Sequence, residues 1–300
     1  MLKNCLTIMF LLSSIVIFSK ENFTIEGQLI GAKDRSLVEV VVCNYEESTL
    51  ISGEVLNEKV VFNLKDEVKE GVYVVRINYV SGKLNLRHVY QFYIIIDKTE
   101  NKLSFEFDPA KSSYPNILNS DINRNWYNFL KLEDFRIKVI NEVKNSIEYK
   151  NSNLSTTTER LKEILDIETK ELINIRSKYL KENYNKWSTA MVKNKFNSLY
   201  HGNSTKESYW DQFETQNVQL INTPIYQELI MSYLLLHFKN VDENGYKAAF
   251  EKVIEVFSFN LDMKKWVVKY LVAGLSSIKN ENLLSFFNSK YQLKDKSTLE

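Results

Sequence analysis

The chain has 300 residues, of which 44% are hydrophobic and 26% charged, and its formal net charge is +1. This length is enough for two ordinary domains, and the balanced charge argues against the basic surface of a nucleic-acid-binding protein. Eight glycines and three prolines are too few for a loop-rich or fibrous protein.

The N-terminus has the pattern of a secretory signal peptide. Lys3 precedes a mostly apolar run at residues 6–18, which ends in the polar residues 19–22. A run of 13 residues is shorter than the ~20 residues that span a bilayer as a helix, whereas a positive start, a short apolar core and a small final residue are typical of a leader. We therefore predict a leader at residues 1–19 and an exported, periplasmic or otherwise extracytoplasmic protein. The alternatives are an uncleaved anchor or a first buried strand, because Ile17 stands where a small residue normally precedes the cleavage site.

The two cysteines are Cys5, inside the predicted leader, and Cys43. Removal of the leader would leave one thiol, which cannot form an internal disulfide, and no CxxC pair is present. Cys43 follows a valine-rich, strand-like run, so we predict a small buried core residue and not a reactive thiol.

Residues 20–110 are expected to form an antiparallel β-sandwich. Apolar and polar residues alternate at residues 23–29, 60–64, 70–80, 87–97 and 103–107, and successive side chains of a strand point to opposite faces. In the run at residues 70–80, one predicted buried face consists of Tyr73, Val75, Ile77 and Tyr79. The nearly all-valine run at residues 37–43 fits a strand covered on both sides, and residues 44–52 fit a loop or short edge strand. Strands at this spacing, without helical segments among them, predict two packed sheets.

Residues 120–293 are expected to form an all-α helical bundle. From Asn123 onward the apolar residues recur three and four positions apart, which places them on one helical face. We predict six or seven helices. Thr156 and Glu159 form the pattern of a capping box at the start of one, and Thr223-Pro224 fits a cap followed by a first helical residue.

The residues that often carry chemistry form no recognisable site. His88, His201 and His237 lack ligand-like spacing, and phosphate-binding and nucleophile-elbow motifs are absent. We therefore predict no catalytic, cofactor-binding or metal-binding residue and no cofactor. The acidic residues crowded on one predicted helix, with basic residues between them, fit a solvated face better than an acid/base pair; they are Glu159, Glu163, Asp166 and Glu168.

Aromatic side chains make up 13% of the chain. Most fall on predicted helical stripes and are expected in the core. Trp210 lies in a polar, aromatic segment away from such a stripe, and we predict that it is exposed and adhesive.

The order of these segments resembles the front part of exported bacterial TlpA/ResA-like thiol-disulfide oxidoreductases. The resemblance covers about residues 23–291 and depends on the leader, Phe23-Thr-Ile-Glu-Gly27, Gly71-Val-Tyr73 and Thr223-Pro224-Ile-Tyr226. In that family a β domain and a helical domain precede a thioredoxin-like module that carries the catalytic CxxC. No cysteine follows Cys43 here, so no catalytic residue of the family can be assigned. We expect either a naturally solitary front end or a chain that has been cut before its thioredoxin-like module.

These observations lead to three hypotheses. The first is an exported, non-catalytic binding or scaffolding protein with a protein, peptide or glycan partner in the cell envelope, and with membrane contact only through an uncleaved leader. The second is a hydrolase with a site in the cleft between the two domains, because domain junctions commonly hold ligand sites. The third is recognition of glycan or peptide by an exposed face of the sandwich.

Overall fold

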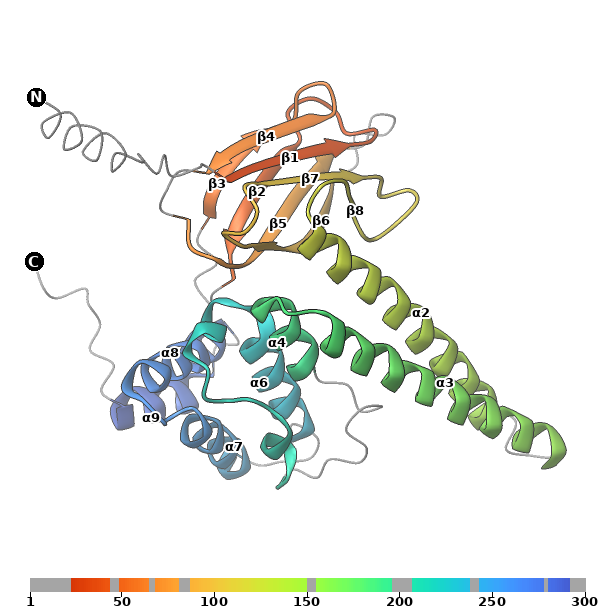
Figure 1. The fold of residues 1–300 in the computed structure, drawn as a ribbon. Coiled ribbons are helices and arrows are strands. Elements are labelled where there is room, and N and C mark those ends of the chain that lie inside the picture. Colours follow the sequence, from red (N-terminus) through yellow and green to blue (C-terminus); the bar gives the residue numbers. More distant parts are fainter. Residues whose placement is uncertain are drawn as a thin grey trace, which may run out of the picture.

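The computed structural model describes residues 23–43, 49–64, 68–80, 87–149, 155–195, 207–237, 243–277 and 280–291. Within these ranges the strands come first, between residues 23 and 117, and the α-helices follow from residue 121 (Figure 1). The protein is therefore an α+β protein in which a β-sandwich precedes a helical part, as the sequence predicts.

Two four-stranded sheets make up the sandwich, with the orders β4-β1-β7-β8 and β3-β2-β5-β6. The described strands are β1 (Phe23–Leu29), β2 (Leu37–Val42), β3 (Thr49–Glu54), β4 (Lys59–Leu64), β5 (Gly71–Val80), β6 (Arg87–Ile96), β7 (Lys102–Phe107) and β8 (Asn116–Ile117). The pairings are antiparallel except that β1 and β7 run parallel. The chain crosses from β6 in the second sheet to β7 in the first sheet. Strands β1 and β7 are therefore not joined by a hairpin, which would make them antiparallel.

Strand β5 has the buried face that its alternation predicts. Tyr73, Val75, Ile77 and Tyr79 are all buried between the sheets. Aromatic rings from β6 and β7 meet there, with the ring centroids of Phe92 and Phe105 5.1 Å apart. The core of the sandwich is thus built from the alternating residues of each strand.

Strand β2 is covered on both sides. Val40 is buried against the sandwich interior, and Val41 is buried on the opposite face, where Pro224 of the helical part lies close by. Cys43 is buried, as predicted. The predicted loop or edge strand at residues 44–52 contains the start of β3, an edge strand, while residues 44–48 lie outside the described ranges.

The described helical part contains α2 (Asp121–Tyr149), α3 (Ser155–Glu182), α4 (Lys186–Asn194), α6 (Pro224–His237), α7 (Glu243–Val256), α8 (Leu261–Ser277) and α9 (Glu281–Tyr291). Two short 3₁₀ helices, η1 (Tyr209–Gln212) and η2 (Val218–Asn222), precede α6. Pro224 is the first residue of α6, and the Ile225 amide donates to Thr223 Oγ1 at 3.3 Å. The predicted cap is therefore confirmed.

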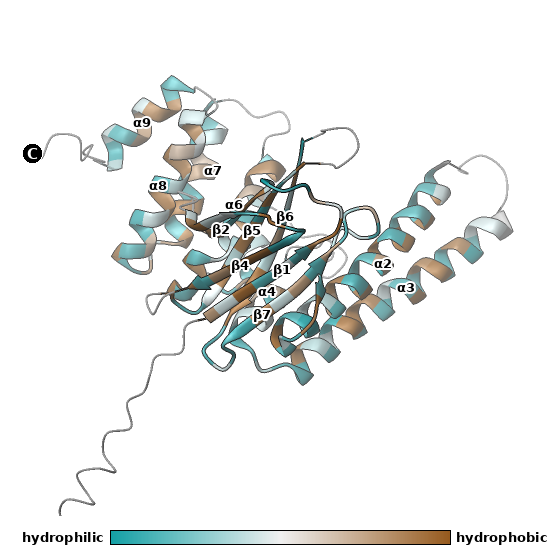
Figure 2. Ribbon diagram, turned by 90° about the horizontal axis from the view of Figure 1, so that it is seen from above, coloured by the Kyte–Doolittle hydropathy of each residue, from teal (hydrophilic) through white to brown (hydrophobic). Residues whose placement is uncertain are grey.

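Helices α2 and α3 form a long hairpin that leads away from the sandwich (Figure 1). Apolar and polar residues alternate around both helices (Figure 2), and Arg136 of α2 bonds to Glu168 of α3 at 2.6 Å. Glu159, Glu163 and Asp166 lie on the exposed side, so the interpretation as a largely solvated face is confirmed. Helix α3 begins at Ser155, so Thr156 lies inside the helix and not at its cap; its side chain is outside those described.

The prediction for Trp210 is wrong. Its side chain is only 7% exposed, because η1 turns it into an aromatic cluster in which its ring centroid lies 4.9 Å from that of Tyr233 and 5.6 Å from that of Phe257. A residue in a polar segment has thus become part of the core of the helical part.

The predicted leader lies outside the described residues. In the ranges that the structure covers, each helix is too short or too polar to cross a membrane.

Candidate ligand-binding site

The helical part is fixed to the sandwich along the outer edge of β6. Asn123, in the first turn of α2, donates through its amide to the carbonyl of Ile95 and accepts from the Ile95 amide, both at 2.8 Å. One turn later the Tyr127 hydroxyl donates to the carbonyl of Tyr93. Because Asn123 is fully buried, its side chain replaces the neighbouring strand that this part of the edge lacks.

Helix α4 provides a second attachment. Asn185 caps it by accepting from the amides of Trp187 and Ser188, and its own amide donates to Asp97 at the end of β6 at 2.7 Å. The next residue, Lys186, bonds to Glu70 at 2.8 Å, which lowers the pKa of that carboxyl below its usual value. These contacts place the start of α4 beside the sheet.

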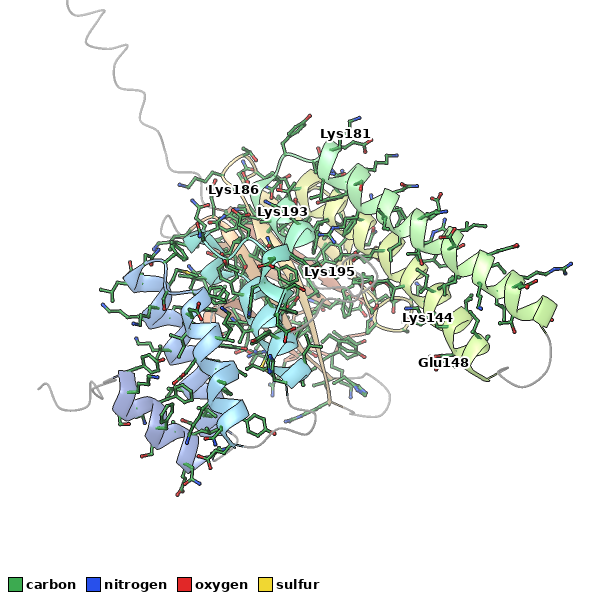
Figure 3. The ribbon with its side chains drawn as sticks, turned by 90° about the horizontal axis from the view of Figure 1, so that it is seen from below. Lys144, Glu148, Lys181, Lys186, Lys193 and Lys195 are labelled. Atoms are coloured by element: carbon green, nitrogen blue, oxygen red, sulfur yellow. The ribbon has the colours of Figure 1, made fainter. Side chains whose placement is uncertain are left out.

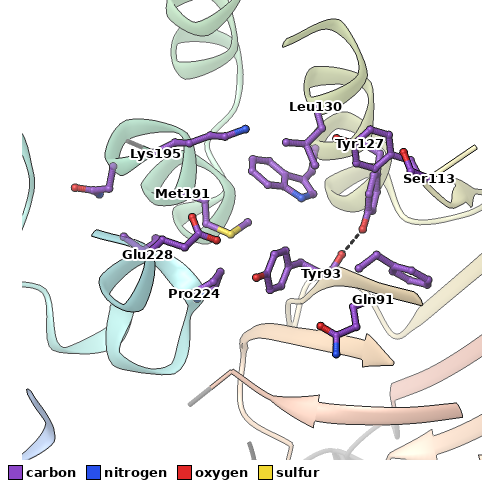
Figure 4. A pocket seen from close by; sticks show the side chains of 14 residues that line it. Gln91, Tyr93, Ser113, Tyr127, Leu130, Met191, Lys195, Pro224 and Glu228 are labelled. Carbon is purple, nitrogen blue, oxygen red and sulfur yellow. Dashed lines mark hydrogen bonds between the residues drawn. The ribbon is translucent and has the colours of Figure 1, made fainter. Parts of the chain in front are cut away.

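A cavity of about 240 Å³ lies where these elements meet. Figure 4 shows the Glu228 carboxylate and the Tyr93 ring projecting toward this space from α6 and β6, with Met191 of α4 between them. The other lining residues come from β6, from the segment before β8, and from α2, α4 and α6; they are Gln91, Phe92, Ser113, Tyr114, Trp126, Tyr127, Leu130, Asn194, Lys195, Pro224 and Ile225.

Carboxylates outnumber cations around the cavity. Lys195, which follows α4, forms an ion pair with Glu133 of α2, whose side chain is 1% exposed. In Figure 3, Lys195 lies between Lys193 of α4 and Lys144 of α2. Tyr114 bonds to Asp134, and Glu228 lines the cavity itself. Among the lining residues and the partners named here, Glu228, Glu133 and Asp134 supply three carboxylates and Lys195 one ammonium, a balance that attracts positive charge.

Glu228 combines access to water with a crowded surrounding. Its side chain is exposed at the cavity mouth, but the protein atoms around it remove part of its hydration and raise the pKa of its carboxyl, an effect that the positive charge of Lys195 opposes. A carboxylate whose pKa is perturbed inside a pocket is a common mark of a functional site.

Trp126 lines the cavity, but its hydrogen-bond donor is buried within the protein. Its side chain is 4% exposed, and its Nε1 is buried without a hydrogen-bond partner in the described part of the chain. A buried N–H group without an acceptor costs free energy. Trp126 therefore contributes the apolar surface of its ring to the cavity wall.

The arrangement is suited to binding a small cationic group with an apolar stem. Aromatic faces and a carboxylate attract ammonium and guanidinium groups, and the apolar walls accommodate the carbon chain that carries them. Glu228 is the one Asp or Glu among the described lining residues, so these residues do not form the pair of carboxylates that many hydrolases use.

The histidines that the sequence offers do not converge here. His88 is exposed on β6, His237 ends α6, and His201 lies outside the described residues. Where the structure describes the chain, no three His, Cys, Asp or Glu side chains are grouped as a metal site requires.

The sequence prediction missed the residues of this cavity. One signal was present, because Glu228 is the single acidic residue in the otherwise largely apolar helix α6. A charge on a helix that is buried on most sides needs either a partner or a function. Glu133 gave no such signal, since α2 carries many charged residues and its burial depends on where α4 ends.

No protein-family model, curated protein or solved structure matches the chain.

Proposed function

We propose that the protein is an exported, non-catalytic binding protein that holds a cationic side chain or a similar organic cation in the cavity between the sandwich and the helices. The observation that carries the proposal is the cavity itself, with aromatic walls, Glu228 at its mouth and an excess of carboxylates around it. Export is supported by the leader-like pattern of residues 1–19. A role beside redox proteins of the envelope is supported only by the resemblance to TlpA/ResA-like proteins.

The volume of the cavity fits one amino-acid side chain. Its 240 Å³ is below the range of about 300–1,000 Å³ that is usual for pockets for drug-sized ligands. A lysine or arginine side chain combines an apolar stem with a terminal cation, so it complements both the walls and Glu228.

Two small probes that differ in charge test this function. Nα-acetyl-lysine methylamide and Nα-acetyl-norleucine methylamide share an apolar stem, but only the first carries an ammonium group. We expect the lysine compound to change the tryptophan fluorescence of the full chain saturably, and the norleucine compound to bind at least tenfold more weakly. Trp126→Phe should remove much of the signal, since Trp126 lines the cavity.

Glu228→Gln should weaken binding of the lysine compound at least tenfold, because the variant keeps the shape of the side chain and removes its charge. The matched control is Glu142→Gln, an exposed residue of α2 that does not line the cavity. Equal binding of both probes, or binding that Glu228→Gln leaves unchanged, would contradict the proposal.

A hydrolase is the second candidate, favoured by the raised pKa of Glu228 in a cavity at the junction. A carboxyl group with a raised pKa can act as a general acid. Incubation with Nα-acetyl-lysine p-nitroanilide tests it. Release of p-nitroaniline that Glu228→Gln abolishes would establish the hydrolase, whereas saturable binding without release supports the binding protein.

A further inference from the structure

Strand β6 has one covered half and one open half along the same edge. In an antiparallel pair, alternate residues direct both backbone groups toward the partner strand or away from it. Both backbone groups of Ile95 and the carbonyl of Tyr93 bond to α2, and the register between β5 and β6 is continuous. The backbone groups of Gln91, Val89 and Arg87 therefore also point away from β5.

This second half of the edge is accessible. β6 is the last strand of its sheet, and no hydrogen bond from the described residues reaches the outward backbone groups of Gln91, Val89 or Arg87. All three residues are exposed, and Val89 is 61% exposed. An exposed edge of this kind is a template for pairing with another strand.

The open edge leads directly into the cavity. Gln91, Phe92 and Tyr93 belong to β6 and also line the cavity, at the point where α2 begins to cover the edge. The five residues from Arg87 to Gln91 extend over roughly 17 Å at the usual rise of a strand. A segment paired with them would reach the cavity with the side chain at its end.

We propose that the open half of β6 and the cavity form one site, in which a short extended peptide adds to β6 as a further strand and places a lysine or arginine side chain beside Glu228. The inference rests on the proposed function, since it identifies the cationic group as part of a peptide. Backbone hydrogen bonds to β6 supply affinity for any extended segment, and the cavity with its excess of carboxylates selects the basic residue.

The main competing occupant is a second copy of the chain paired through its own β6. Five residues of ladder bury far less than the roughly 1,000 Å² that a stable interface between proteins needs. A peptide has no such requirement, because a few backbone hydrogen bonds and one buried side chain suffice for a transient complex. The geometry therefore favours a peptide.

Selection from a library of displayed ten-residue peptides on the full chain tests the inference, and the enriched sequences are then synthesised with a fluorescent label. We expect enriched sequences to share one lysine or arginine next to a segment with strand propensity. Val89→Pro should weaken their binding at least tenfold, because proline removes the outward N–H while the bonds to β5 remain. Val89→Thr keeps this N–H and a β-branched side chain, so its affinity should equal that of the parent, and equal melting curves verify the fold.

The outcomes distinguish a failure of the strand-addition proposal from a failure of the proposed function. If the enriched peptides bind Val89→Pro and the parent equally, or if no peptide is enriched while the lysine compound still binds in the cavity, strand addition is wrong and the proposed function stands. If neither peptides nor the lysine compound bind, both are wrong. A dimer in sedimentation equilibrium that Val89→Pro dissociates would identify the second copy as the occupant and overturn the peptide.

Discussion

The interior of the sandwich and its junction with the helices are both buried, but they are held together by different interactions. Between the sheets the contacts are almost all apolar and aromatic, and among the described residues before the end of β6 Ser36 is the one buried polar residue. The other described buried polar residues lie at the end of β6 or in the segments and helices that follow it; they are Asp97, Ser120, Asn123, Glu133, Ser188, Asn194 and Thr223.

The difference shows how the two regions acquire their specificity. Apolar burial is non-directional and supplies most of the stability, whereas a buried polar group is tolerated only with a partner in the right place. The contact of Asn123 with Ile95 therefore fixes α2 on the sheet, and the ion pair of Lys195 with Glu133 joins the end of α4 to α2. The cavity lies between the elements that these directional contacts join.

The largest effect is expected from a charge placed in the interior of the sandwich. Tyr73→Asp would put a carboxylate at a site that is 6% exposed and would remove a ring from the core. Loss of a buried aromatic side chain costs about 3–5 kcal/mol, and an unpaired buried charge adds to this. Because whole domains are stable by only about 5–15 kcal/mol, we expect the sandwich to unfold, which circular dichroism and a melting curve would show.

Tyr73→Phe is the matched control. It removes only the hydrogen bond from the Tyr73 hydroxyl to the carbonyl of Lys69, which is 2.6 Å long, and should cost about 1 kcal/mol. A melting curve of Tyr73→Asp that matches the parent would show that this face of β5 is not the core.

The second effect concerns the ion pair at the junction. Lys195→Met removes the ammonium next to Glu133, whose carboxylate is buried, and breaking a buried pair in this way costs about 3 kcal/mol or more. Tryptophan fluorescence during urea unfolding measures this loss well, since all four tryptophans lie in the helical part. Lys195→Met combined with Glu133→Gln should recover part of the stability, because no charge remains buried. A double variant that is less stable than either single variant would contradict this account.

The contrast between these two sites also explains what the sequence could predict. The burial of Tyr73 follows from a period of two within a single strand, so neighbours in the sequence suffice to predict it. The burial of Glu133 depends on Lys195, 62 residues away. A contact between residues so far apart in the sequence leaves no local pattern from which it could be predicted. The prediction that Trp210 is exposed failed for the same reason, because its partners Tyr233 and Phe257 lie in later segments. Fold class and most element positions were therefore predictable, whereas the cavity was not, because β6, α2, α4, α6 and the segment before β8 all contribute to it.

A third prediction tests whether the covered half of β6 depends on Asn123. Asn123→Ala leaves the amide and the carbonyl of Ile95 without partners in a buried place, and we expect a loss of about 2 kcal/mol in the free energy of unfolding. Ile122→Ala is the control, as it changes the neighbouring, partly buried side chain and leaves both hydrogen bonds intact. Amide hydrogen exchange of Ile95 should accelerate in Asn123→Ala alone. Unchanged exchange would show that α2 does not protect this edge.

The smallest effect on stability is expected at Glu228, where the site is open to water. The protein atoms around Glu228 remove part of its hydration and raise the pKa of its carboxyl in the folded chain, so the folded state favours the protonated form. The associated stability is present at low pH and is lost as the pH rises through the raised pKa. Glu228→Gln removes this dependence. The variant should therefore match the parent near pH 4 and be more stable near pH 7, by less than about 1 kcal/mol because the side chain is exposed. Binding of the lysine compound should show the opposite trend, weakening in the parent as the pH falls and Glu228 is protonated. A variant that is less stable than the parent at pH 7 would show that Glu228 stabilises the fold. Glu228 would then be one of the residues that hold the junction together, and not a residue available to a ligand.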